Sequence, residues 1–305
     1  MKKSLLTFGP VAKILAFALL VIAMDAGLGA VLRKGYFSQK YGVLSRITYA
    51  LDKTRAEGLI LGSSRASHHY ITDSLSKAKN MSFYNAGKDG QSIFYHYAVL
   101  KSVLSRYTPK LIVLDLLNDE LYEKSESYDR LAELLPYCRD HKELNFVEAL
   151  RGPYEKYKMQ SQIYPFNSLM ISIASGNSSL AKNRFVEKNG YLPLFGKFTG
   201  KVDELEPERQ LAIDKHKLDV YHAFIKECRE RNIKLYITIS PYLKVLPSSG
   251  STKMLKEVAA QNQVPFYDFS NDEHFVLQRD FFWDTGHLNN TGAALFTKMI
   301  AKSII

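Results

Sequence analysis

The sequence predicts an α/β fold, a flavodoxin-like three-layer α/β/α sandwich around a parallel five-stranded sheet. Two observations predict it. Of the 305 residues, 46% are hydrophobic, which suits one large core. From Gly58 onward, short apolar and β-branched runs alternate with stretches of helical periodicity, a pattern typical of parallel strands joined by helices. The expected strands are Leu59–Leu61, Ser82–Tyr84, Leu111–Leu116, Lys234–Ile239 and Pro265–Phe269.

The first element of the chain is an apolar span, Ile14–Leu32, interrupted only by Asp25. As a helix it is about 28 Å long, which is enough to cross the hydrocarbon core of a membrane. Lys2, Lys3 and Lys13 precede it, and the positive-inside rule then predicts a cytoplasmic N-terminus with the remainder outside. The alternative is a cleaved signal peptide, although the span is longer than a usual signal core.

The chain is therefore expected to have two regions. Residues 1–34 form the cytoplasmic N-terminus and the membrane anchor, and residues 35–305 form one α/β domain outside a bacterial cytoplasmic membrane, in the periplasm or the extracellular space. Residues 35–57, rich in Tyr, Lys and Arg, are expected to be a tether that lies on this domain.

Charge and cysteine content limit the partners. The formal net charge is +10, but part of it lies near the N-terminus, and no basic run is interleaved with aromatic residues as in nucleic-acid grooves. The expected partner is a negatively charged envelope surface, and binding to nucleic acid is not expected. Cys228 falls on an apolar helical stripe and is expected to be a buried free thiol; a disulfide with Cys138 is the alternative. No cluster has zinc-ligand spacing, so neither a metal nor another cofactor is expected.

Helical periodicity fills the gaps between the expected strands. Apolar residues recur at spacings of three and four from Ile93 to Tyr107 and from Leu211 to Cys228. Asn290 is expected to cap the last helix. The segment from about residue 120 to 207 is too long for a simple crossover, and its pieces predict a helical insertion over the C-terminal edge of the sheet. These pieces are Asp129–Leu135, Leu144–Leu150 and Leu169–Ala174.

Aromatic and basic side chains gather in the middle of this insertion. Aromatic faces and cations suit a sugar polymer, so the cluster is a candidate glycan site. The alternative is an amphipathic cover with a solvated face. The residues are Tyr154, Lys156, Tyr157, Lys158 and Tyr164.

Four short polar stretches follow expected strands or precede the last helix, where an open α/β sheet places its ligand site. They are Gly62-Ser63-Ser64, the turn from Asn85 to Gly90, Asn118-Asp119, and the stretch from Asp284 to His287.

These stretches supply each group that acyl transfer through serine requires. Ser64 is the expected nucleophile, His287 the base that takes its proton, and Asp284 the carboxylate that orients the imidazole. The expected donors to the oxyanion are the N–H groups of Ser64 and Gly90 and the side-chain amide of Asn118.

Alternatives stay open at each position. Ser63 is the alternative nucleophile, and His68 and His69 are alternative bases, although the helix expected after the turn directs them away. The structural alternatives are a positive φ at Gly90, a turn cap at Asn118 and a helix-entry cap at Asp284.

The four stretches, in this order, resemble the sequence blocks of the SGNH or GDSL hydrolases. The resemblance covers about residues 55–120 and 230–305 and implies a flavodoxin-like sheet and a metal-free esterase, deacetylase or acyltransferase mechanism. An anchor followed by Gly-Ser-Ser is similar to the membrane-anchored envelope branch, which includes the D-alanine transfer protein of teichoic acids and the acetylation proteins of alginate. The implied substrate is an O-acylated polysaccharide or glycolipid of the cell envelope.

The chain departs from the family pattern at two positions. Ser63 stands where many members have Asp, and Leu116 stands where a glycine is usual. Leu116 and Leu117, the two leucines before Asn118, and the large insertion keep a second function open, an inactive envelope protein that binds glycan or a membrane-bound acyltransferase. A Ser64 hydroxyl more than about 5 Å from both nitrogens of His287 favours that second function.

Overall fold

The computed structural model describes residues 9–178, 189–202 and 211–303. Its centre is a five-stranded sheet in the order β2-β1-β3-β4-β5, in which every neighbouring pair is parallel. This order is that of the flavodoxin-like doubly wound sheets, so the predicted fold class is confirmed. The strands are β1 (Gly58–Gly62), β2 (Phe83–Asn85), β3 (Leu111–Asp115), β4 (Lys234–Ile239) and β5 (Phe266–Asp268).

Both faces of the sheet are buried, which explains why the strands read as nearly continuous apolar runs. Side chains of one strand alternate between two separate cores. In β1, Leu59 and Leu61 belong to one core and Ile60 to the other. All three are fully buried, so the central strand presents no face to solvent.

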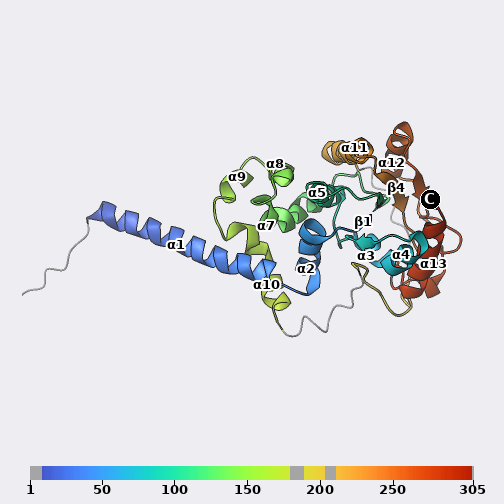
Figure 1. Cartoon of the computed structure of the whole chain (residues 1–305), viewed down its shortest axis with the longest axis horizontal. Helices are drawn as coiled ribbons and strands as arrows, with labels where there is room; N and C mark the ends of the chain where they lie inside the picture. Colours follow the sequence, from blue (N-terminus) through green and yellow to red (C-terminus); the bar gives the residue numbers. More distant parts are fainter. Residues whose placement is uncertain (1–8, 179–188, 203–210, 304–305) are drawn as a thin grey trace, which may run out of the picture.

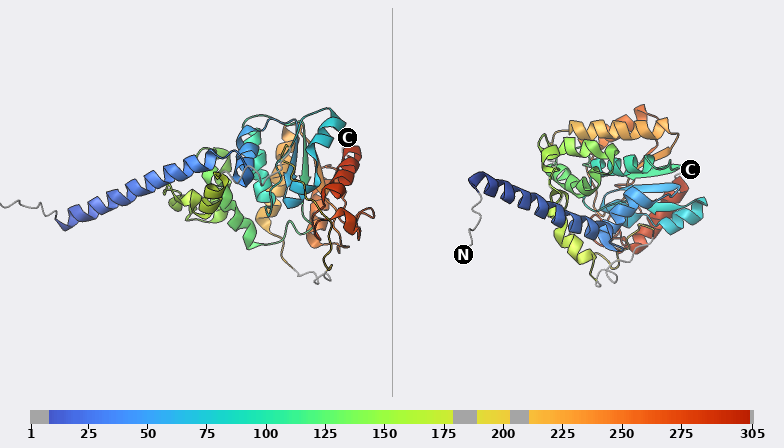
Figure 2. Two further views of the ribbon diagram at one scale, coloured as in Figure 1. Left: turned by 90° about the horizontal axis from the view of Figure 1, so that it is seen from below. Right: turned by 60° about the vertical axis from the view of Figure 1, so that its left-hand side comes forward.

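Helices form the two outer layers (Figures 1 and 2). The Leu59 face of the sheet is covered by α5 (Ile93–Leu104), α11 (Lys215–Glu230) and α12 (Gly250–Gln261). The Ile60 face is covered by α3 (Ser64–His69), α4 (Thr72–Lys79) and α13 (Asn290–Ser303). The right-hand view of Figure 2 shows α11 on one side of the sheet and α4 and α13 on the other.

Two helix starts differ from the sequence-based expectation. Leu211 lies before α11, whose first turn is capped by Asp214, because this carboxylate accepts from the N–H groups of His216 at 2.9 Å and Lys217 at 3.2 Å. The cap of α13 is Asn289 and not Asn290: its side-chain oxygen accepts from the N–H groups of the second and third residues of the helix, both at 3.0 Å.

The N-terminal helix α1 (Pro10–Phe37) extends away from the domain (Figures 1 and 2). It is long and apolar enough to span a membrane, with a mean hydropathy of 2.3 over its most apolar window, and a secretion signal passes the same test. Lys2 and Lys3, on which the predicted orientation depends, lie outside the described residues. The helix runs past the predicted boundary at residue 34, and Tyr36 is fully buried in the core.

The predicted tether of residues 35–57 is helical and partly buried. After α1 the chain forms α2 (Gly42–Thr48) and a π-helical turn, η1 (Tyr49–Lys53). Ile47 and Leu51 are buried in the core on the Leu59 face. This segment therefore belongs to the packed domain and does not merely lie on it.

The insertion is helical, as predicted, and links the anchor helix to the sheet. At the C-terminal edge of the sheet, Glu133 of the insertion pairs with Lys88 at 2.5 Å and accepts from Gln91 at 3.2 Å. Its predicted end near residue 207 lies outside the described residues. Its helices are α6 (Ser125–Asp129), η2 (Arg130–Leu134), α7 (Leu135–Cys138), η3 (Lys142–Leu144), α8 (Asn145–Arg151), α9 (Glu155–Lys158), η4 (Tyr164–Leu169) and α10 (Met170–Gly176).

Both cysteines are free and buried. The prediction for Cys228 is confirmed, and the disulfide alternative is not formed. Burial raises the pKa of the Cys138 thiol to about 12, and burial also raises the pKa of Cys228. Both groups are therefore neutral thiols at neutral pH.

Candidate active site

The first candidate residue, Ser64, begins α3 directly after β1. From β1 the chain continues to β2 on one side and later to β3 on the other, so this turn lies where the strand order reverses. Gly62 makes the turn possible: it has a φ of +154°, and a Cβ there would lie 2.5 Å from the carbonyl oxygen of Asp115. A larger residue would separate β1 from β3 at the point where the hydroxyl is presented.

Ser64, His287 and Asp284 form one continuous hydrogen-bonded row. The Ser64 hydroxyl lies 2.7 Å from Nε2 of His287, and Nδ1 of the same ring lies 2.8 Å from a carboxylate oxygen of Asp284. The side chains of His287 and Asp284 are 27% and 35% exposed, so the row is open to an incoming molecule. The structure thus brings Ser64 into contact with His287, which lies 223 positions later in the sequence.

A short closed loop holds the base and its carboxylate. Phe282 and Leu288 form an antiparallel bridge around it, and Asp284 accepts from the backbone N–H groups of Gly286 at 2.8 Å and His287 at 2.7 Å. Burial alone would raise the pKa of Asp284, but the hydrogen bonds from His287 and Gly286 outweigh it and hold the pKa below its ordinary value. Asp284 is therefore a charged acceptor at neutral pH, and the helix-entry cap is Asn289 instead.

The hydrogen bond of Ser64 distinguishes it from the alternative nucleophile. Ser63 is buried, and its hydroxyl has no partner among the described residues. The alternative base His68 places Nδ1 2.7 Å from the carbonyl oxygen of Leu192. The rings of His68 and His69 lie edge-on to that of His287, at 5.6 and 6.3 Å between centroids, so both histidines are closer to the site than expected.

The side chain of Asn118 is oriented by its neighbours. The Tyr242 hydroxyl donates to its amide oxygen at 3.2 Å, and the Thr252 hydroxyl donates to its backbone carbonyl at 3.0 Å. Within the described residues the amide N–H groups of Asn118 have no acceptor, so they stay available to a ligand. Leu116, the departure from the family pattern, is fully buried in the core on the Leu59 face. The oxyanion role of Asn118 stays a prediction.

The second block forms a turn against the end of β1. Asn85 donates its amide to the carbonyl oxygen of Ala66 in α3 at 2.6 Å, which ties the turn to the helix that carries Ser64. Gly90 has a φ of +71°, and the guanidinium of Arg130 lies 2.3 Å from the position that a Cβ would take. The positive φ favours glycine there, and a larger residue would also displace the flexible end of Arg130. Its predicted role as an oxyanion donor stays a prediction.

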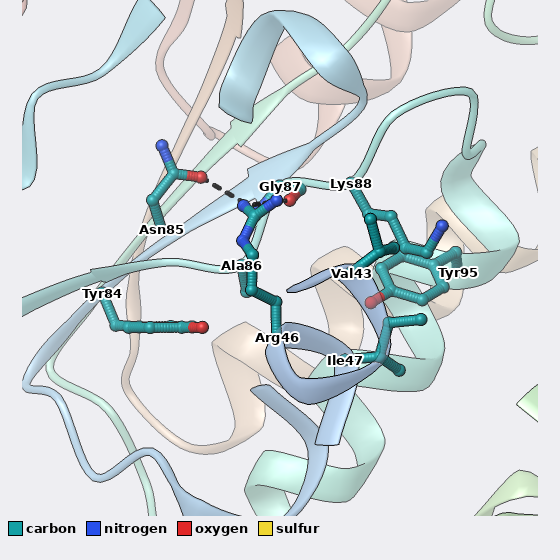
Figure 3. Close-up of a pocket in the computed structure, with 9 residues that line it drawn as sticks. All are labelled: Val43, Arg46, Ile47, Tyr84, Asn85, Ala86, Gly87, Lys88 and Tyr95. Atoms are coloured by element: carbon teal, nitrogen blue, oxygen red, sulfur yellow. Dashed lines mark hydrogen bonds between the residues drawn. The ribbon is translucent and has the colours of Figure 1, made fainter. Parts of the chain in front are cut away.

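Figure 3 shows a small cavity beside this turn. Arg46, from α2, reaches across it and donates to the carbonyl oxygens of Gly87 at 3.1 Å and Gly190 at 2.7 Å. The cavity has a volume of about 10 Å³, which is room for one water molecule and no substrate. Arg46 therefore braces the turn. In the described part of the chain, no group of three His, Cys, Asp or Glu side chains is arranged to hold a metal ion.

A buried polar network beneath the row was not predicted. Asp115, the last residue of β3, accepts from the hydroxyl of Ser240 at 2.9 Å. That hydroxyl lies 3.0 Å from Nδ1 of His69, and Nε2 of His69 accepts from the N–H of Leu288 at 2.9 Å. Arg65 donates to the Ser240 hydroxyl at 3.1 Å, and its guanidinium stacks on the ring of Tyr242. The network connects β3 and α3 to the residue after the base.

His69 is neutral in this network. Because the Leu288 N–H donates to Nε2, that nitrogen carries no proton, and Nδ1 donates to Ser240. Burial, with the charge of Arg65 nearby, holds the pKa of His69 well below its usual range. Asp115 at the end of β3 and Ser240 directly after β4 were the sequence signal for this network, since strand ends line the ligand edge.

Replacing His69 by leucine is expected to lower kcat for a small ester on the order of 10²-fold with little change in KM, because the loop that carries His287 loses its anchor. Steady-state kinetics of His69→Leu and His69→Gln check this, since glutamine keeps an acceptor for the Leu288 N–H and restores much of kcat. His96→Leu is the matched control: His96 is equally buried, and neither ring nitrogen has a partner among the described residues. Equal kcat in His69→Leu and the parent contradicts the positioning role.

No protein-family model and no curated protein matches the chain. Several solved structures are similar to it. An acetyl xylan esterase, AlAXEase, is 15% identical with a TM-score of 0.40, over 81% of this chain and 100% of that one. A lipase/acylhydrolase from Enterococcus faecalis is 12% identical with a TM-score of 0.40, over 81% and 94%. A GDSL-like lipase from Bacteroides thetaiotaomicron is 11% identical with a TM-score of 0.37, over 81% and 86%. At these values the likeness assigns no activity to this chain.

Proposed function

We propose that this chain is a membrane-anchored serine acyl hydrolase or acyltransferase that acts on O-acyl groups of cell-envelope polysaccharide or glycolipid. One observation carries the proposal: the Ser64 hydroxyl lies 2.7 Å from Nε2 of His287, whose other ring nitrogen lies 2.8 Å from the Asp284 carboxylate. This is the arrangement that turns a serine hydroxyl into a nucleophile at neutral pH.

The first half of the reaction forms an acyl-enzyme. Ser64 Oγ attacks the ester carbonyl while His287 Nε2 takes the hydroxyl proton, and the charge of Asp284 stabilises the imidazolium. Collapse of the tetrahedral intermediate breaks the bond to the sugar oxygen, which leaves with the proton from His287. The amide N–H groups of Asn118 and the N–H groups of Ser64 and Gly90 are the proposed donors to the oxyanion.

The second half repeats these steps with a new nucleophile. Water or a sugar hydroxyl gives its proton to His287 and attacks the acyl carbonyl, and Ser64 leaves with that proton. Water gives hydrolysis, and a sugar hydroxyl gives transfer. No step needs a metal or another cofactor, so the side chains named above suffice for either outcome.

The non-catalytic alternative, a protein of this fold that binds glycan or a membrane-bound acyltransferase, is not favoured. A distance of more than about 5 Å between the Ser64 hydroxyl and the His287 ring would favour this alternative, and the observed distance is 2.7 Å. Leu116, one of the two leucines before Asn118, packs in the core and so does not fill the site.

The helix α1 supports the proposal of an envelope substrate. Its 28 residues suit a single membrane crossing, and with the N-terminus in the cytoplasm the domain faces outside the cytoplasmic membrane. There an anchored enzyme meets surface glycans and glycolipids at short range.

The proposal is tested by offering the full chain, in detergent micelles, an aryl acetate and an O-acetylated polysaccharide. Release of acetate from both is the expected result of hydrolysis; with an added acceptor sugar, aryl alcohol released in excess of acetate is the expected result of transfer. If neither the aryl acetate nor the polysaccharide is turned over, the proposal is contradicted.

A further inference from the structure

One short helix of the insertion presents an aromatic and basic surface that the proposed chemistry does not use. We call it the α9 face: Tyr154, Lys156, Tyr157 and Lys158. Tyr154 and Tyr157 are 71% and 61% exposed. Nζ of Lys156 lies 4.9 Å from the centre of the Tyr157 ring. Large exposed aromatic side chains beside cations indicate an interaction surface.

A buried carboxylate holds the α9 face in place. Glu155 is 1% exposed and accepts from Arg151 at 2.8 Å, from the Tyr164 hydroxyl at 2.7 Å and from Lys158 at 3.3 Å. Because these bonds fix one side of α9 to the domain, the two exposed tyrosines are presented on the other side. The surface is part of the packed insertion and not a loose loop.

The residues directly after α9 are bonded to the anchor helix. Asp25 of α1 accepts from the Ser161 hydroxyl at 2.5 Å and from the Gln162 N–H at 2.6 Å. A Cβ at Gly29 would lie 2.3 Å from Cβ of Gln162, so the backbones touch there. The α9 face therefore lies near the level of Asp25 along α1, and Figure 1 shows α9 on the side of the domain nearest the N-terminal half of α1.

Beyond Asp25, toward the N-terminus, α1 leaves the domain and exposes a continuous apolar surface. The large exposed side chains there are Val11, Ile14, Leu15, Phe17, Leu19, Leu20, Val21, Ile22 and Met24.

We propose that the α9 face lies in the polar interface of the membrane that α1 crosses, with Tyr154 and Tyr157 at headgroup level and Lys156 against anionic phosphate groups. Tyrosine is enriched at this depth, and lysine is attracted to anionic lipid. This inference rests on the proposed function only in taking α1 as the anchor. It places the outer boundary of the hydrocarbon core near Asp25 and not at Leu32, so the crossing uses the N-terminal part of α1 and begins before Ile14, the predicted start of the span.

The consequence concerns the substrate. An insertion that contacts both the lipid surface and, through Glu133, the Lys88–Gln91 turn fixes the site at a set height and tilt over the membrane. Such an enzyme takes its acyl ester from a molecule held at the same surface. The helix α9 lies apart from β1, the strand that ends just before Ser64 (Figure 1), so the α9 face suits lipid better than a glycan bound at the catalytic row.

Depth-dependent quenching of tryptophan fluorescence tests the inference. The chain has one tryptophan, Trp283, which is first replaced by phenylalanine. The full-length variants Tyr154→Trp and Tyr157→Trp, each in vesicles of phosphatidylcholine and phosphatidylglycerol, are expected to lose about half of their emission when the lipids are brominated near the headgroup. Phe195→Trp, at a position 68% exposed on another part of the domain, is the matched control and is expected to keep its emission.

Ile22→Trp separates this inference from the proposed function. If Ile22→Trp is quenched and both α9 variants are not, the anchor stands and the inference is overturned. An α9 face that binds a protein partner instead of lipid would give this result, because the vesicles contain no partner protein. If Ile22→Trp is not quenched, the anchor and the inference fail together, while esterase activity is measured separately. Quenching of Ile22→Trp and both α9 variants, with Phe195→Trp unchanged, supports the inference.

Discussion

Replacing Ser64 by alanine is expected to lower kcat for a small aryl acetate by about 10³-fold or more, because the row then has no nucleophile and only binding and oxyanion donors remain. The imidazole of His287 loses its 2.7 Å contact, and no other described hydroxyl replaces it. Spectrophotometric release of the aryl alcohol measures the effect.

Ser63→Ala is the matched control for this experiment. Ser63 directly precedes Ser64 and is buried. Its hydroxyl has no partner in the part of the chain that the structure describes. This variant is expected to keep kcat within a small factor of the parent. Equal rates for Ser64→Ala and the parent, or a large loss in Ser63→Ala, contradicts the assignment of the nucleophile.

Replacing Asp284 by asparagine is expected to lower kcat by about 10²- to 10⁴-fold, because a neutral amide neither stabilises the imidazolium nor keeps the imidazole in the required tautomer. Asparagine retains an oxygen for the N–H groups of Gly286 and His287, so the loop is expected to stay folded. Asp280→Asn is the control, since Asp280 is 74% exposed and pairs with Lys197 at the surface.

The pH dependence of the Asp284 effect follows from its pKa. This pKa is lowered in the folded protein, so the carboxylate is charged at every pH above its ordinary value near 4. Its contribution to stability is present above that value and is lost as the pH falls through the folded pKa. The difference in free energy of unfolding between the parent and Asp284→Asn is therefore expected to be constant from about pH 6 to 8; a difference that shrinks toward the acid end of that range contradicts a charged Asp284.

The architecture was predictable because its strands and helices each have a recognisable local sequence pattern. All five strands lie within two residues of the predicted ranges. The central strands β1 and β3 were easiest to predict, since strands buried on both faces are apolar runs. Ser64 was predictable because it follows a strand at the carboxyl edge of the sheet, and Asp284 and His287 because they stand just before the last helix, at the same edge. Asp214 and Asn289, the true helix caps, were missed although both are residue types that favour this position.

Contacts between distant segments were not predictable. The network of His69, Asp115 and Ser240 forms between three separate segments, and each residue alone has an ordinary local explanation. The packing of residues 35–57 was missed because α2 and η1 are short and lack a clear helical period. The apolar span alone gave no reason for a carboxylate at Asp25. The hydrogen bond from Ser161 to Asp25, between the insertion and α1, supplies that reason.

Covalent labelling tests the central claim most directly. The full-length chain is treated with a fluorophosphonate, which reacts with an activated serine hydroxyl, and the adduct is located by peptide mass spectrometry. The account predicts one adduct, on Ser64, which is absent after His287→Ala. An adduct on Ser63 or Ser240 in the parent, an unlabelled Ser64, or undiminished labelling of Ser64 without the imidazole contradicts it.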